Sequence, residues 1–239
     1  MPGKYRARVK QLIKMLGSIG KRQSFSLNGL DVKLQPYINF KDGFFVEAGA
    51  NDGLRQSNTL YFEKYLGWKG LLIEPIPELA KQCQKNRPKC IVENCALVAA
   101  DYPEKTVQMH YFGLMSIVDG ALGNPERETE HMQKGTQHMR EGEQMYSLEV
   151  PAVTLSGVLD RHQVENIDLL SLDVEGYEPQ VLLGLDFERH QPKFMLIEVR
   201  SREDIEAIIG RYYTPVAVLS TSSTYSDILY QRRSQATEL

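Results

Sequence analysis

The chain has 239 residues but only three cysteines, and it lacks any long apolar run. Cys83, Cys90 and Cys95 have neither zinc-like nor redox spacing, which favours reduced structural thiols in a reducing compartment. No apolar run has the length needed to span a bilayer. The basic N-terminus also lacks the apolar core and cleavage site of a signal peptide. We therefore expect a cytoplasmic protein.

The sequence also has no excess of positive charge. The formal net charge is −3, whereas binding to nucleic acid depends largely on many Lys and Arg contacts to phosphate. This balance argues against a polynucleotide as partner. A small molecule is the expected substrate.

With 42% hydrophobic residues, the chain is long enough for one α/β domain with a sizeable core. We assign residues 38–239 to this domain and residues 1–37 to a basic helix and a linker. In residues 4–22, apolar side chains recur at helical spacing among Lys and Arg, which predicts an amphipathic helix. Its apolar stripe either packs on the domain, which is favoured, or contacts a membrane surface or a partner.

Within the main domain, extended segments alternate with helical ones. We expect strands at 44–48, 70–74, 91–97, 106–112, 167–173, 193–199, 214–219 and 225–231, and helices near 56–66, 77–86, 154–162, 178–184 and 202–210. This alternation predicts a mostly parallel sheet with helices on both faces. The last two strands have no helix between them, which indicates an antiparallel hairpin at one edge.

The alternation breaks down between about 113 and 147, where a polar stretch interrupts the domain. Long insertions in compact domains are usually functional or disordered. This one precedes the fourth core strand and can fold across the carboxyl edge of the sheet, where ligands bind. It is interpreted as a substrate lid or a homodimer contact, with surface decoration as an equal alternative.

The turn Gly49-Ala50-Asn51-Asp52-Gly53 follows a short buried run. Glycine there lets the backbone approach a ligand that a Cβ would touch. Glu74 ends the next apolar run, about one βαβ unit later, and can accept hydrogen bonds from two ribose hydroxyls. The pair predicts a pocket for a nucleoside cofactor.

The turn favours a cofactor without phosphate. Dinucleotide sites use three glycines and a helix N-terminus to hold a pyrophosphate, whereas the charge of Asp52 would repel it. S-adenosylmethionine has a ribose for Glu74, and its cationic ammonium and sulfonium tolerate Glu47 and Asp52. An NAD-dependent oxidoreductase is therefore the less favoured alternative.

Further carboxylates follow two later strands. Asp173 and Glu175 come directly after one buried run, and Glu198 ends the next. Charges at such partly buried positions need partners. The cofactor's cationic end, a metal or substrate hydroxyls are the candidates. Since nothing in the spacing requires a metal, no metal site is predicted.

At these residues the chain resembles a known family. Five segments resemble, in order, the signature blocks of FkbM-type methyltransferases: Val46–Gly53, Ile73–Pro75, Asn94–Leu97, Val150–Leu155 and Asp173–Gly176. The resemblance runs from about residue 38 to residue 231. It implies the Rossmann-like class I methyltransferase fold, an α/β fold with a seven-stranded, mostly parallel sheet of order 3-2-1-4-5-7-6 whose last strand is antiparallel. It also implies methyl transfer from S-adenosylmethionine, typically to oxygen.

The resemblance also implies roles for single residues. Glu47, Gly49, Asn51 and Gly53, with Asp52 in the same turn, would line the methionine and ribose side of the cofactor. Glu74, followed by Pro75, would hold the ribose, and Asn94 and Ala96 would lie near the adenine. Asp173 would face the amino-acid end of the cofactor or the reacting centre.

Methyl transfer to a hydroxyl requires alignment of the two reacting atoms and a base for the proton. Asp173 and Glu175 are the first candidates for the base, and His110 is the second because it titrates near neutrality. The expected acceptor is a hydroxyl of a sugar, a glycolipid or a natural product. A catalytically silent binding module on the same fold is the alternative from another class.

Overall fold

The computed structural model describes residues 23–137, 139 and 141–234. The amphipathic helix expected over 4–22 lies outside these residues. Within them, no helix is long and apolar enough to cross a membrane. A short 3-10 turn (Leu27–Gly29) and helix α2 (Leu30–Leu34) precede the first strand.

The main sheet has seven strands in the spatial order β10-β11-β9-β8-β1-β2-β3. Numbered within this sheet along the chain, that order is 3-2-1-4-5-7-6 when it is counted from β3, as the resemblance to FkbM-type methyltransferases implies. The last strand, β11, is antiparallel to both of its neighbours, and β10 and β11 form the expected hairpin. The strands are β1 (Phe44–Ala48), β2 (Lys69–Ile73), β3 (Ile91–Glu93), β8 (Leu169–Leu172), β9 (Phe194–Val199), β10 (Tyr213–Thr221) and β11 (Ser226–Arg232).

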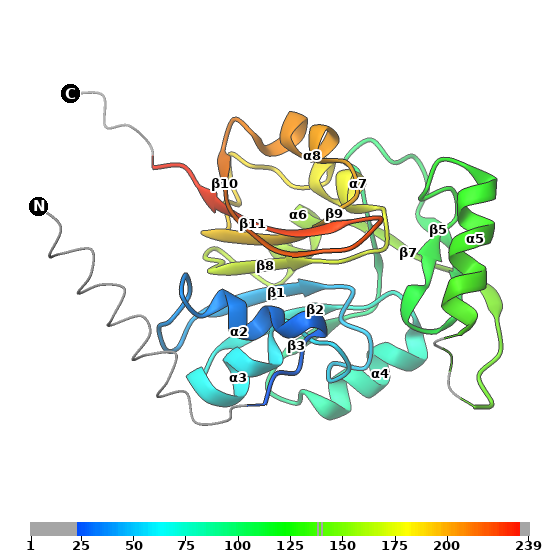
Figure 1. The fold of residues 1–239 in the computed structure, drawn as a ribbon, viewed down its shortest axis with the longest axis horizontal. Coiled ribbons are helices and arrows are strands. Elements are labelled where there is room, and N and C mark those ends of the chain that lie inside the picture. The colour runs from blue at the N-terminus through cyan, green and yellow to red at the C-terminus, as the bar shows by residue number, and fades with distance from the viewer. Residues whose placement is uncertain (1–22, 138, 140, 235–239) are drawn as a thin grey trace, which may run out of the picture.

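Helices cover both faces of this sheet (Figure 1). Alternate residues of a strand point to opposite faces. Val46 and Ala48 thus pack in one core with side chains from α6 (Leu155–Arg161), α7 (Glu178–Leu183) and α8 (Arg202–Ile209). Phe45 packs in the other core with side chains from α2, α3 (Leu60–Leu66) and α4 (Pro77–Asn86). The central strands are therefore apolar on both sides, which explains their short continuous apolar runs.

A second sheet, which the sequence did not predict, has four strands in the order β4-β7-β5-β6. It lies with α5 beyond the carboxyl ends of the main strands (Figure 1). The single strand expected over 91–97 is wrong, because the chain leaves the main sheet after Glu93 and enters the second sheet at Ala96. The elements are β4 (Ala96–Val98), β5 (Thr106–Tyr111), the 3-10 turn η2 (Gly113–Met115), β6 (Ile117–Val118), α5 (Pro125–Thr136) and β7 (Tyr146–Thr154).

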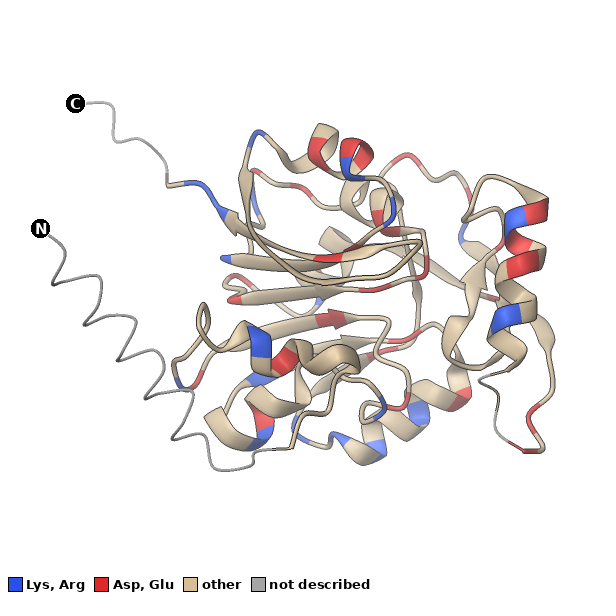
Figure 2. Cartoon of the chain, in the orientation of Figure 1, with Lys and Arg blue, Asp and Glu red and all other residues tan. Residues whose placement is uncertain are grey.

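The segment 113–147 thus contains structure of its own. Helix α5 starts with Asn124 as its N-cap, whose side chain accepts hydrogen bonds from the Glu126 and Arg127 amides, and Pro125 suits the first helical position. Acidic and basic residues are mixed along α5 (Figure 2). His131 of α5 is buried and bonds through Nε2 to the Met115 carbonyl at 3.0 Å. This bond ties the helix to η2.

The turn after β1 is packed directly against the loop after β8. Gly49 has a φ of +83°, and a Cβ added there would lie 1.9 Å from the carbonyl oxygen of Asp173. The Gly49 amide donates to the Ile73 carbonyl at 3.1 Å. This glycine is therefore required by the protein's own backbone, rather than by a ligand.

We predict that Gly49→Ala lowers the free energy of unfolding by about 3 kcal/mol, because the methyl group forces two backbone segments apart. Gly120→Ala is the matched control, since Gly120 also has a positive φ, +76°, but nothing lies within 4 Å of its added Cβ. The control should lose only about 1 kcal/mol of backbone strain. Urea unfolding of both variants checks this, and equal losses would contradict the close approach.

Candidate functional site

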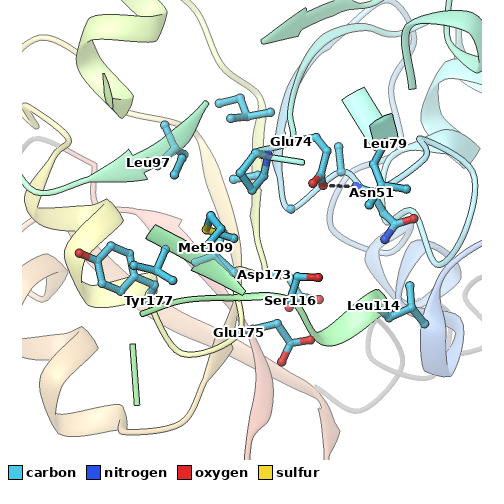
Figure 3. Close-up of a pocket in the computed structure, with 18 of the residues that line it drawn as sticks. Asn51, Glu74, Leu79, Leu97, Met109, Leu114, Ser116, Asp173, Glu175 and Tyr177 are labelled. Carbon is cyan, nitrogen blue, oxygen red and sulfur yellow. Dashed lines mark hydrogen bonds between the residues drawn. The ribbon is translucent and has the colours of Figure 1, made fainter. Parts of the chain in front are cut away.

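A pocket opens where the carboxyl ends of β1, β2 and β8 meet the second sheet (Figure 3). The turn after β1 contributes residues 48–51, and the loops after β2 and β8 contribute Glu74, Pro75, Asp173 and Glu175. The second sheet and η2 close another side with Ala96, Leu97, Met109, Leu114 and Ser116. Parallel strands place their loops at one edge, which is why segments distant in sequence share this cavity.

Glu74 is held rigidly on one wall of the pocket. It is 4% exposed, and its two carboxylate oxygens each accept a backbone hydrogen bond. Oε2 accepts from the Asn51 amide at 2.7 Å and Oε1 from the Ile76 amide at 2.9 Å. Burial outweighs these bonds and raises the pKa of Glu74 to about 7. Each oxygen retains a lone pair for a ligand hydroxyl.

The conformation of the glycine turn positions the Asn51 amide for its hydrogen bond to Glu74. Asn51 has a φ of +50°, and its side chain accepts from the Asp52 amide at 2.8 Å. Asp52 does not line the pocket, because its Oδ1 accepts from the amides of Leu54 and Arg55. Gly53 also lies outside the lining, and a Cβ there would meet Arg87 and Cys83 at 2.9 Å. Both residues therefore shape the turn from behind.

Glu47 is placed on the far side of the turn, away from the pocket lining. It is 4% exposed and accepts from Ser57 Oγ at 2.9 Å, the Asn58 amide at 2.7 Å and Thr59 Oγ1 at 2.6 Å. Arg87 Nη1 lies 3.9 Å from its Oε2. This carboxylate fixes residues 57–59, which explains why α3 begins at Leu60 rather than at the expected residue 56.

Asn94 supports the wall that carries Glu74 indirectly. Its side-chain amide donates to the carbonyls of Glu74 at 2.9 Å and of Pro75 at 2.8 Å. Pro75 and Ala96 do line the pocket, together with the apolar side chains of Leu79 and Leu97. The bonds of Asn94 hold the chain where it passes from β3 to β4.

Asp173 and Glu175 lie close together on another wall of the pocket (Figure 3). Burial raises the pKa of both carboxyl groups, and the Asp173 charge raises that of Glu175 further. Arg200 opposes this effect, with its Nη2 2.8 Å from Glu175 Oε2. His131 Nε2 is 3.5 Å from the same oxygen. Glu175 is thus contacted from β9 and from the insertion.

His110 is not brought to this pocket. It lies on β5, where its Nδ1 is 2.8 Å from Ser147 Oγ and its Nε2 2.9 Å from Asp119 Oδ1. Both ring nitrogens therefore have protein partners. Neighbouring residues of a strand point to opposite faces, so Met109 rather than His110 lines the cavity.

Sequence reasoning did not identify several lining residues. Met109, Leu114, Ser116 and Tyr177 form much of the wall opposite Glu74 and Asn51 (Figure 3). Met109, Leu114 and Ser116 carry no motif, because they enter the site only through the second sheet and η2. Tyr177 directly follows the Asp173–Gly176 motif and is the N-cap residue of α7. The one available signal was the position of the insertion before the fourth core strand.

Comparison with known proteins agrees with this geometry. Residues 47–225 match the family model described as the methyltransferase FkbM domain. The chain belongs to the FkbM methyltransferase family. The predicted family and the predicted class I methyltransferase fold are both confirmed. No curated protein matches the chain.

Solved structures resemble this FkbM chain in fold. The methyltransferase FkbM of Methylobacillus flagellatus has a TM-score of 0.50 and 14% identity, covering 82% of this chain but only 45% of its own. A TehB-like S-adenosylmethionine-dependent methyltransferase of Corynebacterium glutamicum has a TM-score of 0.44 and 10% identity, covering 96% of this chain and 99% of its own. TrmK of M. capricolum, solved with S-adenosylhomocysteine, has a TM-score of 0.43 and 10% identity, covering 91% and 73%.

We predict that Glu47→Gln in this FkbM chain lowers the free energy of unfolding by about 3 kcal/mol, because it breaks a buried, fully bonded ion cluster. Glu104→Gln, an exposed carboxylate, is the control and should change stability by less than about 0.5 kcal/mol. Urea unfolding followed by fluorescence measures both. A stability of Glu47→Gln equal to that of the unmutated protein would show that Glu47 is not a structural anchor.

Proposed function

We propose that this protein is an S-adenosylmethionine-dependent O-methyltransferase acting on a hydroxyl of a sugar, a glycolipid or a natural product. The observation that carries the proposal is the Glu74 carboxylate, fixed by two backbone amides at the wall of the pocket. Membership of a methyltransferase family makes S-adenosylmethionine the methyl donor. Transfer to oxygen and the acceptor class rest on the resemblance and on the acidic wall.

The residues present fit this cofactor. The free lone pairs of Glu74 match a ribose diol, and Ala96, Leu97 and Leu79 offer an apolar surface for adenine. Asp173, across the pocket, accepts no hydrogen bond from the described residues and suits the ammonium group. Glu47, Asp52, Gly53 and Asn94 support the cofactor wall from behind the lining. An NAD-dependent reaction is disfavoured, because no glycine-rich pyrophosphate turn lies at this edge.

The bound cofactor supplies an electrophilic methyl group, and the protein must hold the acceptor oxygen in line with it in a water-poor cavity. Leu114, Ser116 and Met109 narrow the pocket on the side of the second sheet. The carboxylates of Asp173 and Glu175 line the same pocket. We propose them as base candidates in preference to His110, whose ring nitrogens are bonded away from the pocket.

The insertion at 113–147 is proposed as a lid over the acceptor. Residues 113, 114 and 116 line the pocket, and His131 links α5 to both η2 and Glu175. A homodimer contact through this segment, a cytoplasmic location and peripheral membrane contact by residues 1–22 remain further proposals from the sequence.

The donor assignment predicts binding of S-adenosylmethionine and S-adenosylhomocysteine by calorimetry, with no response to NAD. A screen against pools of sugars, glycolipids and natural products should then give one acceptor whose mass rises by one methyl group. Binding of NAD alone would overturn the assignment. Cofactor binding without any turnover across the pools would favour a silent binding module, the competing function.

A second prediction isolates the ribose contact with 5′-methylthioadenosine, which has the ribose but neither ammonium nor sulfonium. Glu74→Gln should weaken its binding by about tenfold to a hundredfold, the worth of hydrogen bonds to a charged group. The pKa of Glu74 is about 7, and its ionised carboxylate accepts the ribose hydrogen bonds. The affinity for 5′-methylthioadenosine should therefore rise with pH through neutrality, as Glu74 ionises, and level off above it. Glu74→Gln should remove this pH dependence.

Exposed Glu104→Gln serves as the control for these titrations and should match the unmutated protein at every pH. If Glu74→Gln bound 5′-methylthioadenosine with unchanged affinity, the ribose assignment would be wrong.

A further inference from the structure

Three carboxylates from three different elements converge beside the pocket, and one of them, Asp173, lines it. Asp173 follows β8, Glu178 begins α7, and Glu198 lies near the end of β9. Strands β8 and β9 are paired in parallel with Leu172 opposite Ile197. Asp173 and Glu198, the next residue along each segment, therefore lie beside each other. One oxygen from each of the three carboxylates lies within 4.8 Å of the others.

The loop after β8 is built to hold this arrangement. Glu178 Oε1 accepts from the amides of Val174 at 2.9 Å and Gly176 at 3.1 Å. Glu175 and Gly176 take positive φ values of +58° and +103°. The loop therefore curls around the Glu178 carboxylate, which fixes Glu178 beside Asp173. Glu175 turns instead to Arg200.

The negative charge of this group is poorly compensated. Glu198 is 6% exposed, yet its Oε1 accepts no hydrogen bond. Arg200 Nη2 lies 2.9 Å from that oxygen and also 2.8 Å from Glu175 Oε2. One guanidinium is thus shared by two carboxylates, and within residues 23–137, 139 and 141–234 neither Asp173 nor Glu178 forms an ion pair.

Uncompensated buried charge is expensive for a folded protein. Asp227 on β11 is also buried, and its carboxyl group lies close enough for the Asp173 charge to raise its pKa. Such a cluster is relieved either by protonation of its carboxyl groups, whose pKa burial raises, or by a further positive charge. Oxygen-only ligands at this spacing match hard cations, which bind carboxylates at about 2.0–2.6 Å.

We propose that Asp173, Glu178 and Glu198 together bind one hard divalent cation of the Mg²⁺, Mn²⁺ or Ca²⁺ class. From the sequence, a metal was one candidate partner for the carboxylates of Asp173, Glu175 and Glu198, but their spacing did not require one. The structure replaces Glu175 with Glu178, a residue that no motif marked.

Because Asp173 also lines the pocket, the bound cation would border the cavity that holds the proposed acceptor oxygen. Asp173 is then a cation ligand, which leaves Glu175 as the candidate base. A cation there would orient that oxygen and make its hydroxyl easier to deprotonate. This catalytic use rests on the proposed methyltransferase function. The binding of the cation itself depends only on the three carboxylates.

The test is calorimetry with Mg²⁺, Mn²⁺ and Ca²⁺ on the full chain after treatment with EDTA, with Mn²⁺ also followed by electron paramagnetic resonance. We expect one ion per chain and a rise in melting temperature on adding the ion. Glu198→Gln should weaken binding at least tenfold and should raise the melting temperature of the metal-free protein, since Arg200 then compensates one carboxylate instead of two.

Glu203→Gln is the matched control, an exposed carboxylate at the start of the neighbouring helix α8, and should bind the ion as the unmutated protein does. Glu178→Gln provides a second ligand variant in case Glu198→Gln does not fold. The proposal is overturned if the unmutated protein binds none of the three ions at millimolar concentration, or if a folded ligand variant binds them with full affinity.

The same samples are titrated with S-adenosylmethionine to separate the two claims. Cofactor binding by the protein after removal of the chelator, together with no binding of added Mg²⁺, Mn²⁺ or Ca²⁺, would leave the methyltransferase proposal standing and remove the cation site. An ion bound without any cofactor binding would do the reverse.

Discussion

The close approach of two backbone turns organises this molecule. Gly49, after β1, lies so near the carbonyl of Asp173, after β8, that no side chain fits between them. This contact sets the turn that carries Asn51 and, through the Asn51 amide, the carboxylate of Glu74. It also places the acidic loop after β8 beside that turn. The positions of the two walls of the pocket therefore depend on one steric contact at the edge of the sheet.

Around this contact, the protein concentrates carboxylates and divides them between structure and ligand binding. Glu47 is saturated by protein donors and anchors the start of α3. Each carboxylate oxygen of Glu74 accepts one hydrogen bond from the protein and has a second lone pair free for a ligand. Asp173 and Glu198 accept no hydrogen bond from the described residues and depend on charge from elsewhere. The degree of hydrogen bonding separates anchors from candidate ligand groups more clearly than burial does, because all of these residues are largely buried.

The second sheet shows where local patterns stop being informative. Strand β7 pairs with β4, whose paired residues lie 56 positions earlier, and with β5, whose paired residues lie 35 to 45 positions earlier. It is only partly buried. Its sequence therefore has neither the apolar run of a central strand nor a turn that would pair it locally. The main-sheet strands were predictable because burial on both faces requires continuous apolar residues. The break at 94–95 was missed, since only the bonds from Asn94 to the backbone of Glu74 and Pro75 reveal it.

The sequence by itself determined the mostly parallel sheet with its final hairpin, the glycine turn and the acidic strand ends, because apolar periodicity and short motifs are local properties of the chain. The strand order and the family followed from the resemblance of five ordered motifs to FkbM-type methyltransferases. Only the tertiary structure decided which of those residues face the pocket. It turned Glu47 and Asp52 toward protein amides, left His110 on the opposite side of β5 from Met109, and brought Glu178 to Asp173 and Glu198. Side-chain direction and the sharing of a single guanidinium depend on contacts between distant segments, and no local pattern encodes these contacts.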